Sequence, residues 1–202
     1  MNPERETVQN LYHFYLKLAD YNNLEKGKCE GIDYVLNLQN AWPSYILGGN
    51  NLTPSGFDKI AREIKAKRLP SFWIREIFPD DHFNEMAFEQ GLRQMNYWTG
   101  MHTENENLFR AHPPVEDITW DRISTEKDLR GWLEVVNQEI MTGKKIDHKI
   151  FRSALHSKEF NFFRIIRAKK TISTVLTFLH EDTVGLYLVS TVGRYRGRGF
   201  GS

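Results

Sequence analysis

The residues most suited to chemistry stand together near the C-terminal end, in the run "RGRGFG" from Arg196 to Gly201. Glycine lacks a Cβ, so a loop rich in glycine can adopt positive φ angles and bring its backbone close to a ligand. Successive N–H groups in such a loop point into one concavity that binds phosphate oxygens, and guanidinium groups pair well with a diphosphate. The apolar run before it, residues 184–192, predicts a strand. The pattern therefore predicts a diphosphate-binding loop at the end of a strand.

Three other interpretations of this run remain open from the residues alone. Short Arg-Gly stretches occur in disordered RNA-binding tails, where arginine stacks on bases and contacts phosphates. A glycine-rich end can also be simply flexible. The third alternative is a dinucleotide-binding fingerprint, which requires a parallel strand–helix–strand unit. The strands predicted here are joined by short turns and do not provide such a unit.

Composition narrows the class of protein. The 202 residues are 40% hydrophobic and 13% aromatic, which indicates a globular core. With 27 basic and 26 acidic residues the formal charge is +1, so we expect neither nucleic acid nor an anionic membrane as a partner. Cys29 is the only cysteine, and the seven histidines lack metal-ligand spacing. The charged N-terminal stretch does not resemble a signal peptide, and no apolar run approaches the ~20 residues that span a bilayer. We expect a soluble, cytoplasmic protein without a metal site.

The elements that would position the glycine loop lie in the second half of the chain. Residues 118–124 alternate as a strand, and Ser124 or Thr125 can cap the helix that follows. The apolar face of that helix is expected to consist of Leu129, Trp132, Leu133, Val136 and Ile140. A short second helix is expected to begin near Asp147. Three runs rich in Val, Ile, Phe and Thr then predict an antiparallel meander over residues 160–167, 172–180 and 184–192.

The first half of the chain also mixes helices and strands. Apolar residues at helical spacing predict an amphipathic first helix, and they are Val8, Leu11, Tyr12, Tyr15, Leu18 and Ala19. Thr53 can cap a second helix, with Pro54 at its first position and Pro70 at its end. Its buried face is expected to consist of Phe57, Ile60, Ala61 and Ile64. A third helix is predicted within residues 80–95. Strands are predicted at residues 32–40, 43–49, 71–78 and 97–104.

The run "RAHPPVED" at residues 110–117 separates the two halves. Two consecutive prolines continue neither a helix nor a central strand, so we interpret this run as a linker. The predicted organisation is a smaller α+β segment over residues 1–110, followed by a unit over residues 116–202. In that unit one strand and two helices precede the three-stranded antiparallel meander. We therefore expect an α+β fold and not a doubly wound parallel sheet.

This order of elements, followed by "VSTVGRYRGRGFG", resembles the GNAT superfamily of acetyl-CoA-dependent N-acetyltransferases. The hallmark of that family at the end of its fourth strand is [Q/R]-x-x-G-x-[G/A]. Here Arg196 fills the first position, Gly199 the fourth and Gly201 the sixth. Val192 and Tyr195 are also similar to residues commonly seen just ahead of the motif. The pattern combined with the strand order carries the resemblance.

The likeness covers residues 116–202, which correspond to the first half of a GNAT domain. Residues 1–110 more faintly resemble the partial GNAT-like half that precedes the catalytic domain in some relatives. The helix that usually follows the motif would lie beyond Ser202, so the resemblance implies a domain truncated just after the diphosphate-binding motif. The fourth strand would then be an exposed edge, which invites pairing with another chain. A homodimer that covers this edge is one expectation.

The resemblance implies a transferase that uses acetyl-CoA and acts on an amine of a small molecule, peptide or protein by direct attack on the thioester. In the family, the pantetheine arm pairs with the backbone of the fourth strand and the diphosphate sits on the loop that follows. Similarity thereby assigns to cofactor contact Val189, Thr191, Val192, Arg196, Gly197, Arg198, Gly199, Phe200, Gly201 and Ser202.

The general acid and base of such a reaction stay unassigned. Tyr187, Ser190 and Thr191 lie on the relevant strand, but a strand tyrosine is more often a packing residue than a catalytic one. Residues 180–182 form the turn at the other end of that strand, where charged side chains are usually solvated. A second function therefore stays open beside the enzyme: a non-catalytic protein-interaction or regulatory module derived from the GNAT fold.

Overall fold

The computed structural model describes residues 3–39, 42–49, 51–76, 82–96, 101, 103, 117–141 and 145–200, without the side chains of Pro3 and Glu4. The strand predicted at residues 97–104 and the linker predicted at 110–117 lie almost wholly outside these ranges. The chain forms two compact units, one of Met1–Phe14 with Met101–Ser202 and one of Tyr15–Gly100. None of the described helices is long and apolar enough to cross a membrane.

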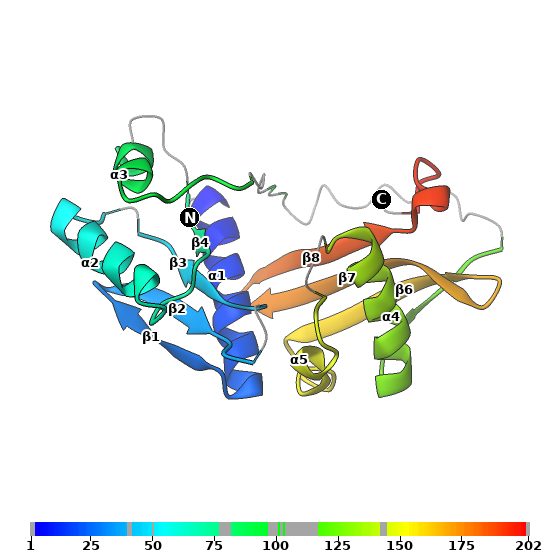
Figure 1. Cartoon of the computed structure of the whole chain (residues 1–202). Coiled ribbons are helices and arrows are strands. Elements are labelled where there is room, and N and C mark those ends of the chain that lie inside the picture. Colours follow the sequence, from blue (N-terminus) through cyan, green and yellow to red (C-terminus); the bar gives the residue numbers. More distant parts are fainter. Residues whose placement is uncertain are drawn as a thin grey trace. The chain divides into compact units, whose positions relative to one another are not determined.

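Both units combine helices with strands, and runs of consecutive strands occur at β1–β3 and at β6–β8 (Figure 1). The described helices are α1 (Pro3–Asn22), α2 (Pro54–Lys65), α3 (Phe83–Glu89), α4 (Glu126–Glu139), α5 (Lys149–Arg152) and the 3-10 turn η2 (Gly193–Tyr195). The described strands are β1 (Glu25–Cys29), β2 (Ile32–Leu36), β3 (Tyr45–Leu47), β4 (Trp73–Ile74), β5 (Thr119–Arg122), β6 (Phe160–Arg167), β7 (Lys170–His180) and β8 (Thr183–Thr191). They form two sheets, in the orders β1-β2-β3-β4 and β5-β6-β7-β8. The predicted α+β fold is confirmed.

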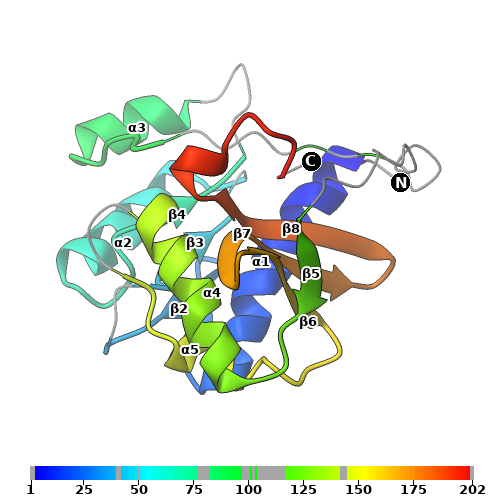
Figure 2. The ribbon, with the colours of Figure 1, turned by 90° about the vertical axis from the view of Figure 1, so that its right-hand side faces the viewer.

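The sheet of the first unit is antiparallel throughout. β5 pairs with β6, β6 with β7 and β7 with β8, so the predicted three-stranded meander is present with β5 added at one edge. The predicted cap of α4 is also present, because the Asp128 N–H donates to Thr125 Oγ1 at 3.1 Å. Figure 2 shows α4 on one side of this sheet.

Large aromatic side chains fill the space between this sheet and its helices. Trp132 of α4 and Phe151 of α5 both meet Phe162 of β6 edge-on, with ring centroids 5.4 Å apart in each pair. All three side chains are fully buried. The indole N–H of Trp132 donates to the Phe163 carbonyl at 2.9 Å, so the large ring is buried without an unpaired polar atom.

The start of α1 packs on the same covered face of the sheet. Phe14 contacts Phe160 and Phe178, each with a ring-centroid separation of 5.7 Å. Phe14 and Asn10 are almost completely buried, whereas the predicted apolar face of this helix did not include either of them. The sequence therefore predicts the helix α1 correctly. The residues of α1 that face this sheet differ from the predicted apolar face.

One arginine joins β5, β6 and the start of α4. Arg164 on β6 donates from Nε to Asp121 of β5 at 2.7 Å and lies 2.9 Å from Asp128 through Nη1. Only 16% of the Arg164 side chain is exposed. A hydrogen bond from the Thr125 hydroxyl, together with Arg164, lowers the pKa of the Asp128 carboxyl below its usual value of 3.8. Asp128 is thus both a helix-capping residue and an ion-pair partner.

The second unit has its own small core. β3 pairs in parallel with β4, and antiparallel pairing joins β1, β2 and β3. Ile32, Ile46, Ile60 and Leu69 form one buried cluster between this sheet and α2. Thr53 caps α2 by accepting the Gly56 N–H at 3.2 Å, as predicted.

The end of α2 differs from the predicted one. The helix ends at Lys65 and not at Pro70, because Lys67 adopts a left-handed φ of +59°. The Lys67 N–H bonds back to the Ile64 carbonyl at 2.9 Å, which satisfies one of the carbonyls at the end of the helix. The left-handed position after the helix is occupied by Lys67 and not by glycine or asparagine, so no sequence signal marks the end of α2.

Other boundaries differ for similar local reasons. The pattern does not predict β1, because the residues Glu25–Cys29 are largely exposed and charged and show no apolar alternation. The strand predicted at 71–78 shortens to Trp73–Ile74 among the described residues. Ile140, expected on the apolar face of α4, lies just past its last turn and is 39% exposed.

We expect Asp128→Asn to lower the free energy of unfolding by about 1 kcal/mol near pH 6, because a charge-assisted bond to Arg164 is lost. The pKa of Asp128 is lower in the folded than in the unfolded chain, so its carboxylate stabilises the fold above about pH 3.8. This stabilisation is lost as the pH falls through the lowered folded-state value. Urea unfolding of both proteins from pH 7 to pH 2.5 measures the difference.

Glu134→Gln is the matched control, since Glu134 is an exposed acid on the same helix. Its unfolding free energy should stay within about 0.5 kcal/mol of the parent at every pH. A gap between Asp128→Asn and the parent that persists unchanged at pH 2.5 would contradict the assigned role of the carboxylate.

Candidate functional site

The strand that leads into the glycine loop carries an extra residue. β8 lies at one end of its sheet, and its pairing with β7 shifts between Thr174 and Leu176. Thr174 pairs with Ser190 and Leu176 pairs with Tyr187, so three steps along β8 match two along β7. Leu188 adopts a left-handed φ of +51°, which is unfavourable for a branched side chain. β8 therefore contains a β-bulge at Leu188 and Val189.

Hydroxyl groups of β7 hold this irregular backbone in place. Thr174 Oγ1 donates to the Leu188 carbonyl at 3.2 Å and lies 2.6 Å from Ser190 Oγ. Ser173 Oγ donates to the Ser190 carbonyl at 2.8 Å and lies 3.0 Å from Thr191 Oγ1. Ser173, Thr174 and Ser190 are all buried. Side-chain hydrogen bonds thus replace ladder bonds where the register shifts.

On the covered face, β8 is tied to α1 by a buried polar contact. The Tyr187 hydroxyl donates to Asn10 Oδ1 at 2.5 Å, and Asn10 Nδ2 donates to the Thr183 carbonyl at 3.0 Å. The Tyr187 ring stacks on Phe14 with centroids 4.3 Å apart. Burial raises the pKa of the Tyr187 phenol well above its usual range. A Cβ at Gly185 would clash with Asn10 and Tyr187, so this close approach requires glycine.

The loop after β8 begins as a short 3-10 turn, and hydrogen bonds hold the residues before and after this turn. The Val192 N–H donates to the Ile172 carbonyl at 2.9 Å, and η2 follows. Arg196 Nε donates to the Thr191 carbonyl at 2.9 Å, and its Nη2 lies 2.7 Å from Glu139 Oε2 at the end of α4. Only 10% of the Glu139 side chain is exposed. The Arg196 guanidinium therefore anchors the loop to the strand and to α4.

Beyond Arg196 the backbone takes the conformations that the glycine pattern predicts. Gly197 and Gly199 have φ angles of +71° and +77°. A Cβ at Gly197 would have open space around it, so its positive φ, and not crowding, requires glycine. Phe200 is buried, and its ring meets Tyr195 at a centroid distance of 6.2 Å. The aromatic pair folds the loop back onto itself.

The predicted cofactor-contact residues that the structure describes lie at the end of β8 and in the loop that follows it. Val189 is 47% exposed on β8, and Arg198 is exposed on the loop. Gly201 and Ser202 lie outside the described residues. The side chain of Phe200 points inward, so only its main chain is available to a ligand. The N–H groups of Tyr195 and Arg196 donate within the 3-10 turn, so these two donors are not available to a ligand.

Sequence reasoning did not find the residues that support this stretch. Glu139, Thr174 and Asn10 each make a bond that shapes β8 or its loop, across separations of 57, 16 and 177 residues. No local spacing signals such contacts. Among the described residues, no group of three or more His, Cys, Asp or Glu side chains is placed to hold a metal ion.

Comparison with solved structures identifies the fold. A GCN5-related N-acetyltransferase from Kribbella flavida aligns with 92% of this chain and 73% of its own length, with a TM-score of 0.60 and 12% sequence identity. At this identity the likeness shows a common fold and nothing further. The chain has the α+β fold of GCN5-related N-acetyltransferases.

Two structures of an aminoglycoside acetyltransferase from an uncultured soil metagenomic sample, in complex with sisomicin and with trehalose, are more distant. Each is 14% identical and covers 42% of this chain, with TM-scores of 0.37 and 0.36, which do not establish a common fold. This chain spans 62% of the length of those proteins. No family model matches the sequence, and no curated protein matches it.

We expect Thr174→Val to lower the free energy of unfolding by about 1–3 kcal/mol, because it leaves the half-buried Leu188 carbonyl and the buried Ser190 hydroxyl without this partner. Thr177→Val on the other face of β7 is the matched control and should be neutral or slightly stabilising. Chemical denaturation of the three proteins measures the effect. Equal stability of the two variants would show that the hydroxyl does not support the bulge.

Proposed function

We propose that the chain binds acetyl-CoA along β8 and its terminal loop and transfers the acetyl group to an amine. The observation that carries the proposal is the bulged edge strand that runs directly into a loop with two glycines at positive φ. An edge strand offers main-chain N–H and C=O groups to an extended ligand, and the loop offers main-chain donors to an anion. The GCN5-related fold supports the same assignment.

The loop fits a diphosphate in its backbone and in its charge. Gly197 keeps the main chain open to close approach, and the exposed Arg198 guanidinium supplies a positive charge. The contacts of Arg196 favour a different role from the predicted direct contact with the cofactor. Because it is held by Glu139 and the Thr191 carbonyl, we propose that it is a positioning residue which fixes the loop.

The strand fits the thioester end of the ligand. Acetyl-CoA supplies an activated acyl group that a neutral amine can attack, and the reaction needs hydrogen-bond donors for the developing oxyanion. The hydroxyls of Ser173, Thr174 and Ser190 are occupied with one another and with main-chain carbonyls. The main chain at the bulge, and not these side chains, is therefore proposed to contact the reacting carbonyl.

Tyr187 does not fit the role of a general acid or base. Its hydroxyl donates to the buried Asn10, and burial raises its pKa far above neutral pH. An amine with a pKa of ~10.4 is almost wholly protonated at pH 7, so it must lose a proton before attack. That proton would have to leave through water or through a group other than Tyr187.

Calorimetric titration of acetyl-CoA into the chain tests the proposal, with Gly197→Ala as the diagnostic variant. Alanine disfavours the left-handed loop by about 1–2 kcal/mol, so we expect binding to weaken about tenfold. Gly91→Ala is the matched control, because Gly91 has a φ of +79° with open space around its Cβ position but lies in the other unit. It should bind as tightly as the parent.

A second assay follows release of the free thiol when acetyl-CoA is mixed with a panel of amines. Thiol release that depends on the amine and is lost in Gly197→Ala would support transfer at this site. Absence of acetyl-CoA binding by a chain that unfolds cooperatively would overturn the proposal.

A second candidate function, a protein-interaction module, is favoured by the other face of the same sheet. Exposed apolar side chains on this face include Trp120, Leu179, Val184, Leu186 and Val189. Cross-strand pairing places Leu179 opposite Val184. An exposed apolar face of this kind is typical of an interaction site, and the same face of a second copy of the chain could pack against it.

If two copies cover this face, the chain should be a dimer at micromolar concentration and Leu186→Lys should shift it to a monomer, because the charge would be buried in the interface. Ile140→Lys, at an exposed apolar position past the end of α4, is the matched control and should leave the dimer intact. Light scattering after size exclusion measures the mass. A monomeric parent would rule out the second-copy arrangement.

A further inference from the structure

Three arginines gather around the ring of Tyr195. The guanidinium carbons of Arg167, Arg194 and Arg198 lie 5.9, 4.9 and 6.0 Å from its ring centroid. Arg167 is the last residue of β6, whereas the other two flank Tyr195 in η2 and in the glycine loop. Residues from two separate parts of the unit therefore bring three positive charges to one ring.

No carboxylate among the described residues forms an ion pair with any of these three arginines. The arginine ion pairs of the described chain involve Arg68, Arg152, Arg164 and Arg196, and none of the three around Tyr195. Any two guanidinium carbons of this cluster lie within about 12 Å of each other, because each is near the same ring centroid. This upper limit exceeds the ~8 Å screening length of physiological salt, so the repulsion between these charges is partly screened. A bound anion would relieve the repulsion.

The turn that presents Arg167 is held in an unfavourable conformation. Ala168 and Lys169, between the paired residues Arg167 and Lys170, have φ angles of +48° and +61°. Two-residue turns of this kind favour Asn-Gly or Gly-Gly, because residues with a Cβ are strained at positive φ. The tight turn fixes the end of β6 and with it the base of the Arg167 side chain. Strain of this kind concentrates where a ligand is clamped.

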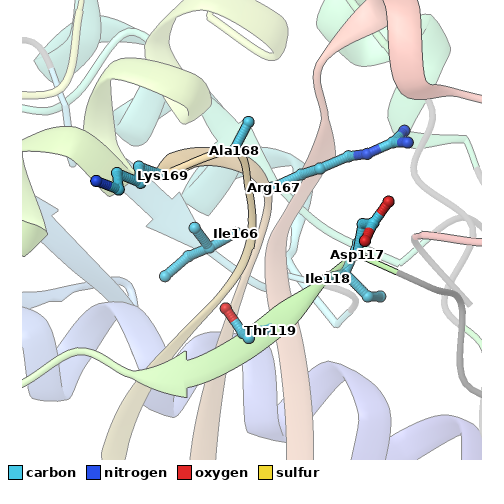
Figure 3. A pocket seen from close by; sticks show the side chains of 7 residues that line it. All are labelled: Asp117, Ile118, Thr119, Ile166, Arg167, Ala168 and Lys169. Atoms are coloured by element: carbon cyan, nitrogen blue, oxygen red, sulfur yellow. The ribbon is translucent and has the colours of Figure 1, made fainter.

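A pocket of about 580 Å³ adjoins the cluster. It lies between the start of β5 and the β6–β7 turn, and its lining residues are Asp117, Ile118, Thr119, Ile166, Arg167, Ala168 and Lys169. Figure 3 shows the Arg167 side chain extending from the turn toward the side on which Asp117 lies, while Lys169 extends the other way. The volume is within the range of small-molecule sites. Arg167 is the residue that belongs both to the pocket and to the cluster.

We propose that Arg167, Arg194 and Arg198 form an anion site that binds a phosphate monoester on the ribose of a nucleotide, with the pocket beside Arg167 holding part of the nucleoside. The identity of the nucleotide rests on the proposed function: in acetyl-CoA this group is the 3′-phosphate. A phosphate monoester carries nearly two charges at neutral pH and accepts several guanidinium hydrogen bonds. Arg167 acts as a specificity-determining residue outside the glycine loop.

The test compares ligands that differ only in this phosphate. Adenosine 3′,5′-bisphosphate and adenosine 5′-monophosphate are titrated calorimetrically into the full chain, and so are acetyl-CoA and its 3′-dephospho form. We expect each 3′-phosphorylated ligand to bind about tenfold or more tightly than its partner. In Arg167→Gln this ratio should fall to within about threefold, because one guanidinium contact is removed.

Two further variants make the result specific. Arg130→Gln removes an exposed arginine of α4 and should leave the ratio unchanged. Asp117→Asn removes the carboxylate at the pocket wall and should raise affinity for the 3′-phosphorylated ligands, because an anion is then no longer repelled. Thermal unfolding midpoints close to that of the parent establish that each variant is folded.

The outcomes separate this inference from the proposed function. If the parent binds acetyl-CoA and its dephospho form equally, the anion site is wrong while acetyl-CoA binding stands. If the bisphosphate binds through Arg167 but acetyl-CoA does not bind, the anion site stands and the proposed function fails. Binding of neither ligand overturns both. Tighter binding of a ten-nucleotide single-stranded RNA than of the bisphosphate, lost in Arg167→Gln, would assign the cluster to RNA and overturn the inference.

Discussion

A one-residue shift in strand pairing shapes the candidate site. Because side chains alternate along a strand, Tyr187 and Ser190 would point to opposite faces of a regular β8. The extra residue at Leu188 lets both point to the covered face, where Tyr187 meets Asn10 and Ser190 meets Thr174. The strand can therefore bury polar groups at both ends and still expose its main chain at an edge. In this arrangement the backbone of Leu188 adopts an unfavourable left-handed conformation.

The arginines near the loop differ in their contacts. Arg196 forms an ion pair with the nearly buried Glu139. Arg167, Arg194 and Arg198 instead lie around the ring of Tyr195. A guanidinium already paired with a carboxylate has less to offer a phosphate than one that is not. Within the proposed function, the loop thus combines a main-chain cradle with a separate cluster of side-chain charge.

The sheet of β5–β8 is protected unequally on its two faces. α4, α5 and the start of α1 cover one face with aromatic side chains, while Leu186 and Trp120 remain 66% and 73% exposed on the other. Proteins of similar size usually bury such a face against another layer of structure. The same unit therefore carries a candidate ligand site at one strand end and a candidate interaction surface across its open face.

Local patterns in the sequence determined the order of the described elements apart from β1, the antiparallel meander, the Thr53 cap and the cap of α4 at Ser124 or Thr125, because each depends on neighbouring residues. The start of α1 was predicted as a helix, but its role in the first unit was not. Asn10 and Phe14 meet residues more than 140 positions away, and no period or cap encodes that contact. The bulge, the pairing of Arg196 with Glu139 and the approach of Arg167 to Tyr195 were likewise decided by tertiary structure. Strand register and side-chain packing bring together charges that are remote along the chain, so they determine which arginine pairs with a carboxylate and which gather around Tyr195.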